Sequence, residues 1–319
     1  MTQGRNGRGI VYVWAAGNGA EPQPNAPGTP TDNSNLDGQA NFPAVIAIGA
    51  VGDDGKKASY SEEGANLLVC TPSQGRGGHA ITTVDRTGNV GFNQGTNAND
   101  YANTSYTNTF NGTSSACPLA AGCVALMLQA NPNLTWRDVR LVLARTARRN
   151  DFSDADWKLN GAGLHVNHKY GFGVIDAQAA VTMAVTFQSV GGMSTLKQFA
   201  TPALAVNLPI PDNNPAGLTR TTTVSGSPVS KIEFVQVFFD SDHTFIGDLR
   251  IVLRSPSGTE SVLNVPHSMT QAAGLENYTF STMRHLDEPS NGTWTLKVSD
   301  EFATDTGTLR TWGLVVYGS

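Results

Sequence analysis

Residues 112–118 read Gly-Thr-Ser-Ser-Ala-Cys-Pro and place a serine between a glycine turn and a long apolar segment. Gly112 allows a sharp backbone turn, and Pro118 is tolerated in the first turn of a helix. The pattern therefore predicts a helix over residues 115–130, with Ser114 at its N-terminus. Backbone N–H groups and the positive end of the helix dipole lie beside a hydroxyl in that position. An acyl-transfer nucleophile needs this environment, although an ordinary N-cap serine shares the local pattern.

A second feature lies upstream, where residues 9–19 read Gly-Ile-Val-Tyr-Val-Trp-Ala-Ala-Gly-Asn-Gly. The apolar run predicts a buried strand of a parallel sheet over residues 9–14. Ligand sites of such sheets lie at the carboxyl ends of the strands. Asn18 follows this strand directly, where its amide can donate to a developing oxyanion together with the backbone N–H of a nucleophile.

The first half of the chain alternates apolar strands with helices. Further strands are expected at residues 45–51 and 66–70, and a short helix near residues 177–183. A Thr-x-x-Asp start predicts another helix near Thr135. Residues 93–111 are rich in Asn, Thr and Tyr and indicate a surface loop. This alternation is typical of an α/β domain.

The sequence pattern changes from about Thr186 onward. Short strand-like runs separated by turn signals occupy residues 231–239, 248–253, 292–298 and 309–317. They predict an all-β sandwich. We therefore expect two domains, over residues 1–185 and 186–319.

Composition limits the class of protein. The 319 residues are 39% hydrophobic, which is enough for two ordinary domains, and the formal net charge of −5 argues against nucleic-acid binding. We expect no membrane span, because no run of about 18 apolar residues stands out. We also expect no signal peptide, because residues 1–8 lack an apolar core. Of the three cysteines, Cys117 and Cys123 lie six apart on one expected helix, so they are not expected to pair.

Five motifs in chain order resemble the subtilisin-like serine proteases, and specifically their kexin/furin branch. They are A-A-G-N-G (15–19), Y-S-E (60–62), G-T-S-x-A-x-P-L-A-A-G (112–122), N-P-N-L-T-W-R-D-V (131–139) and H-x-Y-G-F-G-x-I-D-A (168–177). The match runs from about Gly9 to Ala184 and implies a truncated α/β subtilisin-like three-layer domain with a mostly parallel sheet. It also implies that Ser114 is the nucleophile and Asn18 the oxyanion-hole amide. Residues 242–249, 255–259 and 292–294 resemble the P domain that follows the protease domain in this branch, a β jelly-roll sandwich expected to pack on the peptidase domain.

The resemblance also gives a role to the acidic residues downstream of Asn18. The branch carries D-x-C-N-C-D-G-x-x-N, and residues 32–41 match its spacing with Ser34 and Leu36 in place of both cysteines. The loop must therefore be held without the disulfide found in relatives. By resemblance Asp32 and Glu62 are ligands of a calcium ion, for which carboxylate oxygens are suitable.

The resemblance further implies a preference for substrates with a basic P1 residue. Asp37 would lie in the S1 pocket as a buried carboxylate and pair with that side chain. Ala15, Ala16 and Gly17 would form the pocket wall. The implied protein is a calcium-dependent, secreted serine endopeptidase that cleaves proteins or proproteins after Arg or Lys.

Two elements of that enzyme do not occur in the sequence. The D-[ST]-G and H-G-T motifs that supply the triad Asp and His are not found upstream of Asn18. A serine hydroxyl without a base is a weak nucleophile, and neither His79 nor His168 has a precedent in that role. We therefore expect this chain alone to be inactive and its sheet to end in an unpaired edge. The alternative is a catalytically inactive fragment or a non-enzymatic binding or scaffold protein.

Overall fold

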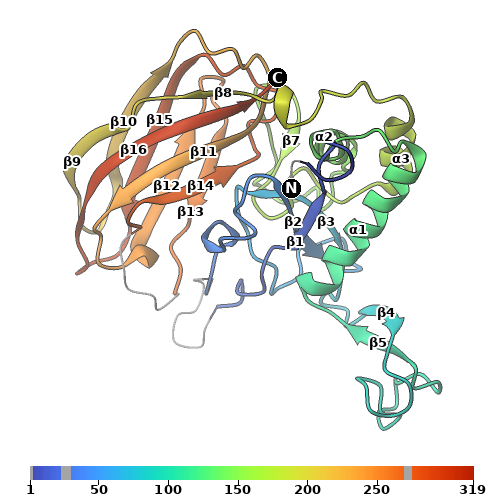
Figure 1. The fold of residues 1–319 in the computed structure, drawn as a ribbon. Coiled ribbons are helices and arrows are strands. Elements are labelled where there is room, and N and C mark those ends of the chain that lie inside the picture. The colour runs from blue at the N-terminus through green and yellow to red at the C-terminus, as the bar shows by residue number, and fades with distance from the viewer. Residues whose placement is uncertain (1–2, 23–29, 269–274) are drawn as a thin grey trace.

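A computed structural model describes residues 3–22, 30–268 and 275–319 (Figure 1). The N-terminal half is α/β. Its parallel sheet has the order β1 (Tyr12–Ala15), β2 (Val45–Val51) and β3 (Leu67–Pro72). The helices α1 (Thr113–Ala130) and α2 (Trp136–Thr146) pack against it, and α3 (Ala177–Thr186) packs on both of these helices. The expected fold class is confirmed for this half.

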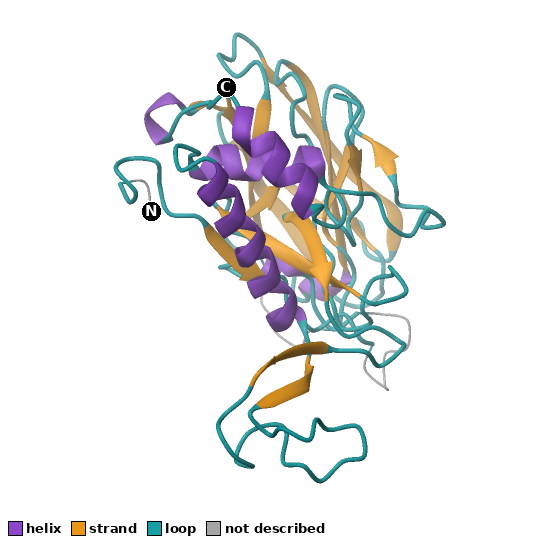
Figure 2. Ribbon diagram, turned by 90° about the vertical axis from the view of Figure 1, so that its right-hand side faces the viewer, coloured by secondary structure: helices purple, strands orange, loops and turns teal. Residues whose placement is uncertain are grey.

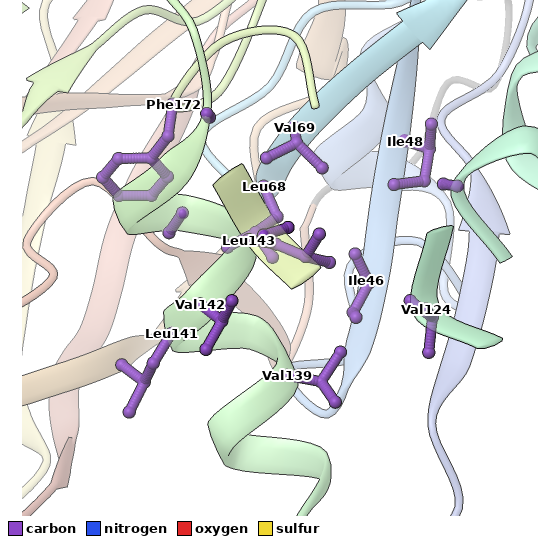
Figure 3. Close-up of a cluster of buried hydrophobic side chains, with 14 of the residues drawn as sticks. Ile46, Ile48, Leu68, Val69, Val124, Val139, Leu141, Val142, Leu143 and Phe172 are labelled. Atoms are coloured by element: carbon purple, nitrogen blue, oxygen red, sulfur yellow. The ribbon is translucent and has the colours of Figure 1, made fainter. Parts of the chain in front are cut away.

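The core of this half lies between the inner strands and the helices (Figure 3). Every residue of β2 is buried, as in a strand covered on both faces. Ile46 and Ile48 of β2 share a cluster with Val124 of α1 and Val142 of α2. Removing one such side chain from water is worth about 1.5–3 kcal/mol, so β2 and the helices hold this half together.

The strand β1 differs from the expected buried strand. It pairs with β2 on one side only within the described chain, and Tyr12 and Trp14 are 39% and 43% exposed. The strand is apolar, as expected, but its burial depends on a neighbour that the described residues do not supply. The expectation of an unpaired sheet edge is therefore met.

Helix ends follow the local chemistry of the sequence. The Thr135 side chain accepts a hydrogen bond from the backbone N–H of Asp138, and the Asp138 carboxylate accepts one from Thr135, which forms the expected capping box. The helix α1 starts after Gly112, whose φ of 78° is costly for other residues. By length and composition this helix is apolar enough to cross a membrane, a test that the core helix of a soluble protein also passes. The expectation of no membrane span stays a prediction.

The expected surface loop at residues 93–111 contains a strand. β5 (Tyr106–Phe110) pairs antiparallel with β4 (Ile81–Val84), and this hairpin projects from the body of the protein (Figures 1 and 2). Thr, Tyr and Phe favour extended backbone, and this preference outweighs the loop-like Asn content. A second small hairpin joins β6 (Lys158–Leu159) and β7 (His165–Val166).

The C-terminal half consists of two antiparallel sheets. One has the order β10 (Asn214–Val224), β15 (Gly292–Asp300), β12 (Leu249–Arg254), β13 (Glu260–Asn264). The other has the order β14 (Tyr278–Thr282), β11 (Ile232–Ser241), β16 (Gly307–Gly318), β8 (Lys197–Ala200), with β9 (Leu204–Ile210) also on β16. Trp294 and Trp312, one from each sheet, are fully buried in a shared core.

Single 3-10 turns lie at η1 (Ser34–Leu36), η2 (Met193–Thr195) and η3 (Ile246–Asp248).

Buried polar contacts join the two halves. The guanidinium of Arg137, at the start of α2, pairs with the Glu233 carboxylate of β11 through two nitrogens. Its remaining nitrogen donates to Thr195 (2.9 Å) and to the carbonyl of Gly192 (3.0 Å) in the connecting segment. Arg137 has no exposed surface, so this one side chain connects α2, the connection and the sandwich.

Candidate active site

Ser114 lies where the glycine turn and α1 meet. It is the second residue of the helix and is exposed, whereas Thr113 and Ser115 on either side are buried. No described residue makes a hydrogen bond to its hydroxyl, so the oxygen faces solvent at the positive end of an 18-residue helix. Ser115 is tied instead to the Gly112 carbonyl and to Ser73 (2.7 Å). The two neighbouring serines thus have different surroundings.

The structure brings Asn18 to the same turn. Its Oδ1 accepts hydrogen bonds from the backbone N–H of Thr113 (2.8 Å) and from the Thr113 hydroxyl (3.0 Å). These bonds orient the amide and leave its Nδ2 to donate elsewhere. A Cβ on Gly112 would come within 3.6 Å of that nitrogen, so the amide lies against the turn that holds Ser114. Thr113 was not singled out from the sequence, although it stands inside the quoted motif.

Asp32 and Glu62 also lie together. Glu62 is 5% exposed, its Oε1 accepts from the N–H of Gly19 (2.8 Å), and a Cβ on Gly19 would meet both side chains. Burial, and then the charge of Asp32, raise the pKa of Glu62 to about 7. Burial also raises the pKa of Asp32. Neither carboxylate forms an ion pair with a described basic residue.

Such a pair suits a hard divalent cation, because a cation would remove the mutual repulsion and the desolvation cost. The fit is that of a partial ligand set, since the described residues hold no group of three metal-ligating side chains. A methyl group on Gly17, which has a φ of 113°, would collide with the Glu62 carboxylate. The bare backbone of the small-residue segment is therefore what leaves room for this side chain.

Asp37 is placed differently from the expected buried carboxylate. It is exposed, and its Oδ1 accepts from the backbone N–H groups of Gln39 (2.9 Å) and Ala40 (2.6 Å). The second oxygen remains open to solvent or to a ligand. The expectation of burial was wrong because no described segment covers this turn. Along the expected pocket wall Ala16 is buried, whereas Ala15 and Gly17 are half-buried.

None of the six histidines in the described chain bonds to Ser114. His79 is exposed and lies 3.8 Å from Asp53. His168 accepts from the backbone N–H of Val262 (2.8 Å) through Nε2 and faces Asp156 (3.0 Å) through Nδ1, so it joins the two halves as a neutral ring. Burial lowers its pKa to about 4. The others contact residues elsewhere: His165 lies on Trp157, His243 on Asp300, His267 on Gly247, and His285 on Ser261.

Comparisons with known proteins agree with this fold. The model of the subtilase family matches residues 1–173, and that of the proprotein convertase P-domain matches residues 232–316. Human proprotein convertase subtilisin/kexin type 7 is 36% identical over 324 residues, which cover 99% of this chain and 38% of that protein. Human neuroendocrine convertase 2 is 33% identical over 332 residues, covering 100% of this chain and 47% of that protein. The chain thus spans less than half the length of these two relatives.

A solved structure extends the likeness to three dimensions. The serine protease of Aeromonas sobria superposes with a TM-score of 0.85 at 27% sequence identity, over 98% of this chain and 65% of that one. The superposition includes both the α/β half and the β-rich half. The expected combination of a subtilisin-like domain with a following P domain is therefore confirmed as a fold.

Proposed function

This chain belongs to the subtilase family, and from that premise we propose that it supplies the nucleophile and the oxyanion amide of a calcium-dependent serine endopeptidase. The protease would act on proteins or proproteins after Arg or Lys. The observation that carries the proposal is the joint placement of Ser114 and Asn18 at the N-terminus of α1, with Thr113 fixing the amide. We place the boundary between its two domains at residues 185 and 186.

In this mechanism the Ser114 hydroxyl attacks the scissile carbonyl and the peptide nitrogen leaves as an amine. The negative charge on the carbonyl oxygen is stabilised by the backbone N–H of Ser114 and by Asn18 Nδ2. Water then hydrolyses the acyl-enzyme. The serine proton must pass to a general base, and no described histidine reaches it. The base and its orienting carboxylate therefore come from polypeptide outside the described residues.

The exposed apolar surface beside the site supports that completion. Tyr12 and Trp14 on the free edge of β1 are 39% and 43% exposed. A parallel sheet is normally covered on both faces, so a further strand and its crossover would continue it here. The competing proposal is a non-enzymatic scaffold, which the missing base favours. Catalysis by an extended chain distinguishes the two.

Asp37 provides the test of substrate preference. In a form of the protein that includes the missing base, Asp37→Asn should lower kcat/KM for Arg-ended peptides by about 10²-fold, because one charge-assisted pair is lost. Asp53→Asn, another exposed carboxylate outside the candidate site, is the matched control and should leave kcat/KM unchanged. If the unmodified enzyme cleaves peptides ending in Leu or Phe faster than Arg-ended ones, the role of Asp37 in binding a basic P1 residue is rejected.

Calcium dependence should show a defined pH profile. Glu62 has a raised pKa in the folded protein, so without cation its stabilising contribution is fully present below pH 4.5 and is lost as the pH rises through 7. A shift of this size corresponds to about 3 kcal/mol. Added calcium should therefore raise the melting temperature much more at pH 8 than at pH 5. Equal shifts at both pH values, or a Glu62→Gln variant with an unchanged calcium response, would contradict the assignment.

Calcium, where bound, would contribute charge neutralisation at Asp32 and Glu62, and these two side chains would hold it. Neither touches the reacting atoms in this scheme. Their part is to fix the segment of small residues around Asn18, since the Glu62 carboxylate accepts a hydrogen bond from the N–H of Gly19. We also propose a secreted location, in keeping with relatives named as proprotein convertases.

A further inference from the structure

The strand β14 forms the outer edge of its sheet in the sandwich, yet its edge groups are not left open. Asn41, in the acidic loop at residues 32–41, places its side-chain amide against them. Its Nδ2 donates to the carbonyl of Thr279 (2.6 Å), and its Oδ1 accepts from the N–H of Ser281 (2.8 Å). A neighbouring strand would supply a donor and an acceptor to these same two edge groups. The Asn41 side chain thus takes the place of such a strand at this point of the edge.

A second amide completes this contact. Asn35 has no exposed surface, and its Nδ2 donates to the carbonyl of Ser281 (2.7 Å) and to Asn41 Oδ1 (3.0 Å). Its Oδ1 accepts from the N–H of Ala65 (2.7 Å). Its backbone carbonyl accepts from the Tyr278 hydroxyl (2.6 Å). Every polar atom of the Asn35 amide group is engaged, so the amide has one preferred orientation.

These two amides belong to the same loop as two acidic residues of the site, Asp32 and Asp37. The N–H of Asn41 donates to the carbonyl of Asp37 (2.8 Å), which closes the turn that presents the Asp37 carboxylate. Asn35 lies two residues after Asn33, whose N–H donates a hydrogen bond to the Asp32 carboxylate (2.6 Å). Burial, and then the charges of Asp37 and Asp32, raise the pKa of Tyr278. The edge of the sandwich and both carboxylates therefore lie in one neighbourhood.

The loop has no covalent bridge of its own. Ser34 and Leu36 stand where the resembling proteases carry cysteines, and the three cysteines of this chain are free. Ser34 accepts a hydrogen bond from Asn66 (3.0 Å), and Leu36 packs against the apolar core of the sandwich. The loop is fastened through buried polar and apolar contacts, several of which belong to the other domain.

We propose that Asn35 and Asn41 are positioning residues, through which the β14 edge of the sandwich holds the loop that carries Asp32 and Asp37. The inference rests on the proposed roles of those two carboxylates and deepens them. It makes the sandwich part of the calcium and specificity site without touching substrate. Loss of the contact should loosen the acidic loop before it separates the domains.

The test compares Asn41→Ala with Asn160→Ala in the 319-residue chain. Asn160 is a matched control, because it is also buried and its Nδ2 also donates to the sandwich, here to the carbonyls of Arg284 (3.0 Å) and Leu286 (2.9 Å). Hydrogen exchange of the backbone amides at residues 32–41 is the first measurement, and calcium affinity by titration calorimetry is the second. Asn41→Asp is a harsher variant, because it keeps one acceptor, turns the donor into a second acceptor that faces the Thr279 carbonyl, and buries a negative charge.

We expect Asn41→Ala to speed exchange across residues 32–41 and to weaken calcium binding, each by about tenfold, as the loss of one or two buried hydrogen bonds implies. Asn41→Asp should speed exchange across the loop at least as much, and Asn160→Ala should leave both quantities unchanged. The proposal is overturned if Asn41→Ala leaves hydrogen exchange at residues 32–41 unchanged, or if Asn160→Ala raises it equally. If the unmodified chain binds no calcium, the calcium assignment fails, while the exchange data still decide the role of Asn41.

Discussion

Ser114→Ala should abolish peptide hydrolysis in a form of the protein that carries the missing histidine and aspartate. We expect kcat to fall on the order of 10⁶-fold, the size found when the nucleophile is removed in subtilisin, which belongs to the same family. Asn18→Ala should lower kcat by only about 10²–10³-fold, again a subtilisin value, because the N–H of Ser114 still stabilises the oxyanion. Steady-state kinetics on one Arg-ended peptide measure both effects.

The neighbouring serine supplies the control for this experiment. Ser115 is buried and bonds to Ser73 and Gly112, so Ser115→Ala should cost about 1 kcal/mol of stability and little activity. A Ser114→Ala protein that keeps a tenth or more of the unmodified kcat would show that another group is the nucleophile. Thr113→Val should lower kcat less than Asn18→Ala does, since it removes one of the two bonds that orient the amide and leaves the one from the Thr113 N–H.

Arg137→Ala should be the most destabilising single change among the interdomain contacts. It leaves the Glu233 carboxylate buried without its partner and frees the acceptors of the connecting segment. Breaking a buried ion pair in this way costs about 3–5 kcal/mol. Chemical denaturation, followed by one probe in each half, should show the lower free energy of unfolding. It should also show the sandwich separating from the α/β half at a lower denaturant concentration.

A second ion pair across the same interface is the natural comparison. Arg145 pairs with Asp287 (2.7 Å), but their side chains are 27% and 16% exposed, so Arg145→Ala should cost about 1 kcal/mol or less. The double variant Arg137→Met with Glu233→Leu should recover most of the loss, because it removes both charges. Equal costs for Arg137→Ala and Arg145→Ala would contradict the assignment of Arg137 as the main connection.

Local rules of the sequence predicted where Ser114 and Asn18 lie in the fold. A glycine turn before an apolar helix placed Ser114, and the end of an apolar strand placed Asn18, because both depend on backbone conformation within a few residues. The capping box at Thr135 was predicted for the same reason. β5 could have been anticipated, since four of its five residues are Tyr, Thr or Phe, which favour strands.

Properties that depend on distant segments were not predictable. Asp37 is exposed and Trp14 lies on an open edge, because burial is decided by what packs above a residue. The pairing of Asn41 with β14 joins positions more than 200 residues apart, and no periodicity in either segment signals it. Replacement of both cysteines indicated only that the acidic loop needed another support, and the sandwich provides it.

We propose that Ser114 is a nucleophile whose base lies outside the described chain. Labelling with a fluorophosphonate decides this, in the 319-residue chain and in a form extended at its N-terminus by a subtilase segment with the Asp and His motifs. We expect rapid labelling of the extended form, lost in its Ser114→Ala variant, and no labelling of the shorter chain. Rapid labelling of Ser114 in the shorter chain, or none in a folded extended form, would contradict the claim.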